Sequence, residues 1–193
     1  KELIRTGNAA IEDPSKSFVQ IANETDKKIN HYDREIENLA IHVIALRQPM
    51  AVDLRHVIAS FKLAVILERM GDLAKKVSHR IEHIPIALSS ELEKLLQEMI
   101  AKLDTSLTDV IFAYETMDDV LASKVSTQDK FIDNYYSEIM SIIETEMKNN
   151  PKDAKPLLDL VLIARNFERI GDYITKVSYI THYIITGNKI IDD

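Results

Sequence analysis

The sequence has no cysteine and no tryptophan, and it contains only 4 glycines and 5 prolines among 193 residues. The absence of cysteine excludes disulfide bonds and thiolate metal sites, and it suits a reducing compartment. So few helix-breaking residues favour a small number of long helices. A chain of this length fits one large domain or two domains of about 100 residues each.

A basic surface and long apolar runs are missing as well. The net charge is −7 at pH 7, and no basic stripe is present, so we expect no nucleic-acid partner. No apolar stretch approaches the ~18–20 residues that cross a bilayer. No leader with a small-residue cleavage site stands at the start. We therefore expect no direct membrane insertion.

Apolar residues recur at spacings of three and four along most of the chain, which predicts an all-α fold. Residues 1–12 resemble the end of a helix whose beginning is missing. The next helix is expected to start at Asp13-Pro14, where Asp is a good N-cap and Pro fits the first turn. A capping box is predicted at residues 90–93, and a break at Asp118-Asp119. After the incomplete first helix, helices are therefore expected over residues 14–46, 52–83, 90–118, 119–149 and 153–185.

The two halves of the chain resemble each other at an offset of 100 residues. Residues 64–78 and 164–178 are identical at 8 of 15 positions, and the turns Gln48-Pro49 and Asn150-Pro151 correspond. We interpret this as an internal duplication. It predicts two tandem antiparallel three-helix bundles, over residues 1–86 and 87–193, in which the first helix of the first bundle is truncated.

Each half carries the motif Glu-Arg-x-Gly-Asp inside a long predicted helix, at residues 68–72 and 168–172. Glu and Asp four residues apart lie on one face of a helix, and two like charges there cost roughly 0.2–0.5 kcal/mol. A glycine in the middle of a helix costs about 1 kcal/mol relative to alanine. A sequence that keeps both penalties twice is expected to compensate them, and a cation between the carboxylates is the simplest candidate.

A second set of oxygen ligands is expected to face each motif. Residues at equal distances from the turn of an antiparallel hairpin lie opposite each other, so Glu68 and Asp72 should face Asp26 and Asn30. By the same rule, the second hairpin should bring together four carboxylates: Glu168, Asp172, Asp129 and Asp133. Sites made only of oxygen atoms suit magnesium, manganese or iron. The sequence thus predicts two candidate metal sites, without fixing the metal.

The alternative interpretation is an ordinary solvated face with salt bridges. In that case Arg69 and Lys76 would pair with Asp72, and Gly71 would only permit close helix packing. His79 and His83 also lie four residues apart on the face of Asp72 and could hold a metal. Because the second half has tyrosines at the equivalent positions, we interpret them as surface histidines.

Three segments resemble motifs of the PhoU family of bacterial phosphate-uptake regulators. Residues 45–55 (ALRQPMAVDLR) resemble the family segment LRQPVAxDLR, while residues 68–74 (ERMGDLA) and 164–174 (ARNFERIGDYI) resemble its two ERIGDHA segments. The resemblance covers nearly the whole chain, in the right order. It implies a fold of two three-helix bundles.

The resemblance also implies a metal motif, E(D)xxxD, on each bundle, with bound iron or other divalent ions. Asn30 replaces an acid of that pattern, and Leu73 and Tyr173 replace the histidine of ERIGDHA. The metal-site residues implied by the resemblance are Glu68, Asp72, Glu168 and Asp172, with Asp26, Asn30, Asp129 and Asp133 facing them.

As a function, the resemblance implies a non-catalytic regulator that links the ATPase of a phosphate ABC transporter to a sensor histidine kinase. Such a protein would be cytoplasmic, held at the inner membrane through protein partners, and a homodimer is an open alternative. A PhoU-like cytoplasmic tail of a sodium–phosphate cotransporter is a second interpretation. A carboxylate-bridged di-metal enzyme is disfavoured, because that class uses Glu-x-x-His pairs and no Glu here has His three residues later.

Overall fold

The computed structural model describes residues 2, 4–5, 18–82, 84 and 88–190. No strand occurs among these residues, and the predicted all-α fold is confirmed. None of their helices combines the length and the apolar character needed to cross a membrane. The predicted helix start at Asp13-Pro14 lies outside the described residues. The helices run as α2 (Val19–Arg47), α3 (Ala51–Ile81), α4 (Ser90–Thr116), α5 (Asp119–Ser126), α6 (Asp129–Asn149) and α7 (Ala154–Thr186).

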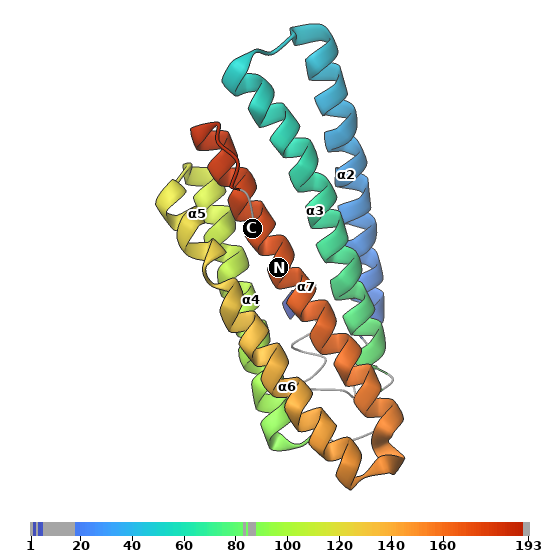
Figure 1. Cartoon of the computed structure of the whole chain (residues 1–193). Coiled ribbons are helices and arrows are strands. Elements are labelled where there is room, and N and C mark those ends of the chain that lie inside the picture. Colours follow the sequence, from blue (N-terminus) through green and yellow to red (C-terminus); the bar gives the residue numbers. More distant parts are fainter. Residues whose placement is uncertain (1, 3, 6–17, 83, 85–87, 191–193) are drawn as a thin grey trace.

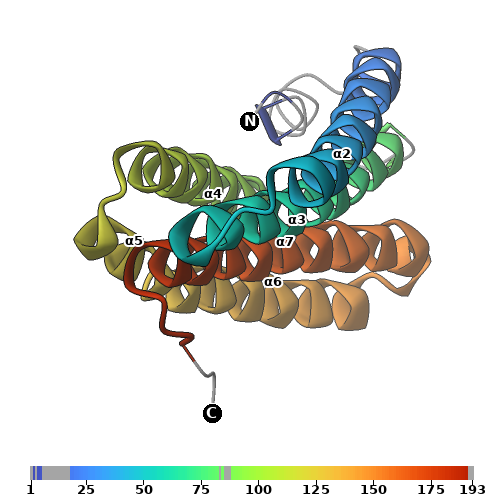
Figure 2. The same ribbon diagram turned by 90° about the horizontal axis from the view of Figure 1, so that it is seen from above.

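The two longest helices, α3 and α7, pack side by side in opposite directions at the centre of the molecule (Figure 1). Helix α2 lies against the outer side of α3, and α6 lies against α7 (Figure 2). Helices α4 and α5 complete the packing around α7. The order α2, α3, α7, α6 therefore places the two outer helices on opposite flanks of the central pair.

The central pair shows the internal duplication directly. Arg80 of α3 forms an ion pair with Asp159 of α7, with Nη1 2.9 Å from Oδ1. The equivalent residues at the offset of 100, Ile180 and Ala59, line one cavity between the same two helices. Equivalent positions of the two halves thus lie between α3 and α7 twice, once as an ion pair and once in the lining of a cavity. The proposed boundary between residues 86 and 87 stays a prediction.

The hydrophobic core is concentrated around α7. Phe167, Ile163 and Ile170 of this helix are fully buried, as are Leu96 of α4 and Ile139 of α6. Burying one such side chain contributes roughly 1.5–3 kcal/mol. These contacts pack α7 between its neighbours and so position the acidic motif that it carries.

Helix α2 is much less buried than its apolar spacing predicts. Only Ala22, Thr25, Asp26 and Ala40 are buried along its length, whereas Leu39 and Leu46 are 62% and 68% exposed. The hairpin of α2 and α3 extends beyond the end of α7 (Figure 1). No described helix other than α3 packs against the far half of α2, so Leu39 and Leu46 remain exposed there.

Two details of the predicted helices are wrong: where α4 starts, and the continuity of the helix that follows it. Ser89, not Ser90, is the N-cap of α4, and its hydroxyl accepts a bond from the Leu92 amide at 3.5 Å. Because Leu92 stands where a capping box needs Glu or Gln, the predicted capping box does not form. The helix expected over residues 119–149 is also divided, since α5 ends at Ser126 and α6 begins at Asp129.

The break between α5 and α6 has both local and tertiary contacts at its origin. The hydroxyls of Ser126 and Thr127 donate to backbone carbonyls three residues earlier, at 2.8 Å each, which competes with the helical pattern. Gln128 is buried and accepts bonds from Lys102 and Ser106 of α4. The break places Asp129 at the first position of α6.

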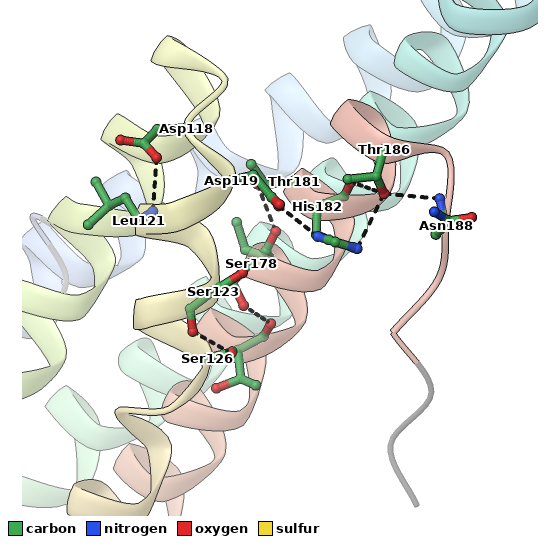
Figure 3. A network of polar contacts seen from close by, with 12 residues as sticks. Asp118, Asp119, Leu121, Ser123, Ser126, Ser178, Thr181, His182, Thr186 and Asn188 are labelled. Carbon is green, nitrogen blue, oxygen red and sulfur yellow. Dashed lines mark hydrogen bonds and ion pairs between the residues drawn. The ribbon is translucent and has the colours of Figure 1, made fainter.

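Helix α5 is joined to the end of α7 by polar contacts (Figure 3). Asp118 is the N-cap of α5 and accepts a bond from the Leu121 amide at 2.9 Å, as expected for a helix that starts after a predicted break. His182 Nδ1 of α7 lies 2.6 Å from Asp119 Oδ1. The Thr186 hydroxyl lies 3.2 Å from the other ring nitrogen of His182.

Candidate functional site

Each Glu-Arg-x-Gly-Asp motif lies on a central helix and faces the outer helix of its hairpin. A Cβ atom at Gly71 would lie 2.8 Å from Ile29 Cδ1 of α2. A Cβ atom at Gly171 would lie 3.1 Å from Asp129 Oδ1 of α6 and also from Ile132 Cγ2. Both glycines therefore permit close helix packing, and this packing accounts for their presence inside a helix without a bound cation.

In the first hairpin, a lysine lies between the facing carboxylates. Lys75 Nζ is 2.7 Å from Asp26 Oδ2 and 3.6 Å from Asp72 Oδ1. The Asn30 amide donates to the same Asp26 oxygen at 3.2 Å, and Lys76 Nζ lies 2.6 Å from Asp72 Oδ2. The bond to Asp26 raises the pKa of Lys75. The bond from Lys76 lowers the pKa of Asp72.

The first site thus takes the form of a salt-bridged helix face. The predicted pairing of Lys76 with Asp72 is confirmed, and the pairing of Arg69 with Asp72 is absent among the described ion pairs. Glu68, also in the predicted set, is half-buried and forms no ion pair among the described residues. Lys75 is not among the predicted site residues, although the change from Lys75 to Thr175 between the two halves is visible in the sequence.

In the second hairpin, the four predicted carboxylates interact with one another. Burial, followed by repulsion from Asp133, Asp172 and Glu168, raises the pKa of Asp129 to about 6. A hydrogen bond with Thr175 opposes part of this rise. The structure therefore brings Asp129 and Asp133 of α6 into the electrostatic field of Glu168 and Asp172 of α7.

The carboxylates on α7 are perturbed in the same direction. Burial, then repulsion from Asp172 and Asp133, raises the pKa of Glu168. Burial also raises the pKa of Asp172, against the opposing charge of Lys176. None of the four carboxylates forms an ion pair with a described Lys, Arg or His side chain. The second hairpin therefore has an excess of negative charge that the first hairpin does not have.

The chemistry of the second cluster fits a hard cation, because it offers carboxylate oxygens and one hydroxyl, from Thr175. In this structure, however, the carboxylates of the cluster do not converge on one point. Among the described residues, no three His, Asp or Glu side chains converge closely enough to form a ready metal site. Of the other predicted candidates, His79 Nε2 lies 3.0 Å from Asn23 Oδ1 of α2, and His83 lies outside the described residues.

Comparison with known proteins agrees with this architecture. The family model described as the PhoU domain matches residues 2–81 and again residues 96–181. The chain belongs to the PhoU family. A PhoU homologue of the phosphate-specific transport system from Caulobacter vibrioides is 36% identical over 183 residues, which cover 94% of this chain and 80% of that protein. The homologue from Zymomonas mobilis is 33% identical, over 97% of this chain and 78% of that protein.

Solved PhoU structures have the same fold. The crystal structure of PhoU from Pseudomonas aeruginosa matches with a TM-score of 0.90 at 27% identity, over 96% of this chain and 90% of that one. The phosphate transport system regulatory protein PhoU from Streptococcus pneumoniae matches with a TM-score of 0.89 at 25% identity, over 98% and 89% of the two chains. The PhoU fold therefore includes both hairpins that carry the acidic motifs.

Proposed function

We propose that this protein is a non-catalytic regulator of phosphate uptake that acts with a phosphate-specific transport system. The observation that carries the proposal is the match to PhoU proteins over both halves of the chain, in sequence and in fold. Its relatives are named as accessory proteins of that transport system.

The proposed role includes contacts with two partners, the ATPase of the transporter and a sensor histidine kinase. We place the protein in the cytoplasm, at the inner membrane only through these partners. A regulator that conveys the state of one partner to the other must bind two states of a partner with different affinity. The two flanks of the molecule, α2 with α3 and α6 with α7, carry different charge and give the protein two distinct faces for this purpose.

We further propose that the second acidic cluster binds a divalent cation or iron, with manganese and magnesium as alternatives. Asp129 and Asp133 from α6, with Glu168 and Asp172 from α7, would hold it. The raised pKa values in this cluster support the proposal, because they report carboxylates that are partly buried and close enough to repel one another. A bound cation would supply that charge and join α6 to α7.

Binding of purified partners tests the proposed function. The transporter ATPase and the cytoplasmic part of the sensor kinase would each be immobilised, and binding of this protein measured with and without manganese and phosphate. We expect binding to both partners, with an affinity for at least one that depends on these conditions. The absence of binding to either partner under every condition would contradict the proposal.

A matched pair of variants connects partner binding to the second cluster. Glu168→Gln with Asp172→Asn removes two charges from α7, and Glu138→Gln with Glu144→Gln removes two charges from the exposed side of α6. If the second cluster contributes to partner binding, only the first pair changes the manganese dependence. Equal changes in both would indicate a general effect of charge.

A further inference from the structure

The two acidic sites differ at two positions that change their charge in the same direction. Asn30 stands where the second hairpin has Asp133, and Lys75 stands where it has Thr175. The first site therefore combines three carboxylates with an inner ammonium group, whereas the second has four carboxylates and a hydroxyl. Lys76 and Lys176 are equivalent in sequence, and Lys76 pairs with Asp72 at 2.6 Å, whereas Asp172 forms no ion pair among the described residues.

The ammonium group of Lys75 has the position of a bridging cation. It comes from α3, bonds to Asp26 of α2 at 2.7 Å and lies 3.6 Å from Asp72 of its own helix. The Asp26 side chain is only 11% exposed and that of Lys75 is 26% exposed. A buried carboxylate requires a partner of opposite charge, and Lys75 supplies it together with the amide of Asn30.

We infer that Lys75 is a tethered counter-ion that takes the place of a metal in the first hairpin. The α2–α3 pair is then held together at all metal concentrations, while the α6–α7 pair gains a cation that bridges its facing carboxylates only when an ion binds. This inference extends the metal binding proposed above for the second cluster. According to this inference, metal binding changes the contacts between α6 and α7 in the second half of the protein, whereas the contact between α2 and α3 in the first half does not depend on metal.

A metal would have to displace Lys75 to enter the first site. The displaced ammonium would leave a 2.7 Å bond to a buried carboxylate, and the metal would find one carboxylate fewer than in the second site. Loss of one partner from a buried pair is costly, because the remaining charge has no compensation. The first site is therefore expected to exclude cations that the second site binds.

Exchange of the differing residues between the sites tests the inference. Lys75→Thr with Asn30→Asp gives the first site the residues of the second, and Thr175→Lys gives the second site the lysine of the first. Lys76→Thr is the control, because it removes the exposed lysine that pairs with Asp72 but leaves the Lys75–Asp26 pair between the two helices intact. Manganese bound per chain would be measured by equilibrium dialysis and elemental analysis.

We expect the double variant to bind twice the manganese of the wild type, Thr175→Lys to lose its manganese, and Lys76→Thr to bind the wild-type amount. An unchanged amount in the double variant would overturn the inference. So would wild-type manganese that is lost on Asp26→Asn substitution, since that metal would occupy the first site.

The experiment separates this inference from the metal binding proposed for the second cluster. If the wild type binds no manganese but the double variant does, the second site fails as a metal site and the role of Lys75 stands. If neither binds, both are overturned. If the double variant unfolds at a lower temperature than the wild type in chelator, the change in its Tm on addition of manganese provides the readout. A larger increase in Tm than in the wild type supports the inference, and an equal increase overturns it.

Discussion

Lys75 Nζ lies 2.7 Å from Asp26 Oδ2 and joins the two helices of the first hairpin, at the level where Thr175 meets Asp129 in the second. The two hairpins share a motif and a register but not a charge balance. In the first, Asp26 and Asp72 form ion pairs with Lys75 and Lys76. In the second, burial and then mutual repulsion raise the pKa of Asp129 and Glu168.

The Asp26–Lys75 pair should contribute measurably to stability. Asp26 is only 7% exposed, so Lys75→Ala leaves a buried carboxylate without its partner and should cost about 1–3 kcal/mol in the free energy of unfolding. Lys76→Ala, which removes an exposed pair with Asp72, should cost at most about 1 kcal/mol. Urea unfolding of Asp26→Asn, Lys75→Ala and the double variant should give costs that do not add, and strictly additive costs would contradict the pairing.

The two buried glycines should respond differently to alanine. At Gly71 the new Cβ meets Cδ1, the mobile end of Ile29, and the gain of about 1 kcal/mol in helix propensity offsets the adjustment. At Gly171 the new Cβ meets both Asp129 Oδ1 and the Cγ2 methyl of Ile132, which is attached directly to the branched Cβ and cannot move independently of it. We expect Gly171→Ala to destabilise the protein by about 1–3 kcal/mol and Gly71→Ala to leave stability nearly unchanged. Thermal unfolding measures both, and an equal response would show that the two helix contacts are equivalent.

The chelated protein should lose stability as pH rises through the range where Asp129 ionises. Its pKa is raised to about 6 in the folded state, so between about pH 4 and 6 the folded state binds more protons than the unfolded chain. The contribution of this group is therefore fully present below pH 4 and is lost as pH rises through 6. Asp129→Asn removes the effect.

Urea unfolding in chelator at pH 4 and pH 7.5 measures this contribution as a difference between wild type and variant. At pH 7.5, Asp129→Asn should be more stable than the wild type by about 1–2 kcal/mol, a value reduced for solvent screening at this partly exposed site. At pH 4 this advantage should disappear. A difference that does not change with pH would show that the carboxylates do not interact as the structure places them.

The contact between Asp119 and His182 should hold α5 on α7. Asp119→Ala removes the 2.6 Å contact with the histidine ring and should cost about 0.5–1.5 kcal/mol locally. Amide hydrogen exchange should then be faster in α5, with little change in α6. Asp118→Ala removes the N-cap of the same helix and should give a similar local effect. Unchanged exchange in α5 after the Asp119 substitution would exclude this role.

The facing register of the acidic residues could be predicted from the sequence because the hairpin turns are short and lie at recognisable prolines. Counting residues from each turn places Asp26 opposite Asp72, and Asp129 opposite Asp172, close to where the structure has them. The long central helices followed equally well from the spacing of apolar residues. Helix positions and hairpin register can therefore be predicted, because both depend on patterns between residues that are close in the sequence.

Features that depend on tertiary contacts could not be predicted in this way. The break after Ser126 contains neither Gly nor Pro and depends on the burial of Gln128 against α4. The long side chain of Lys75 reaches Asp26 on a neighbouring helix, which its spacing from Asp72 along α3 does not indicate. The exposure of Leu39 and Leu46 depends on which helix covers α2, and apolar spacing alone does not specify a partner.

The metal content of protein purified without chelator tests the central claim most directly, when compared between two pairs of substitutions. One pair, Glu168→Gln with Asp172→Asn, alters the second site, and the other, Glu68→Gln with Asp72→Asn, alters the first. Elemental analysis should find metal in the wild type and in the first-site variant, and none in the second-site variant. Metal lost from the first-site variant, or retained by the second-site variant, would contradict the assignment of metal binding to the carboxylates of α6 and α7.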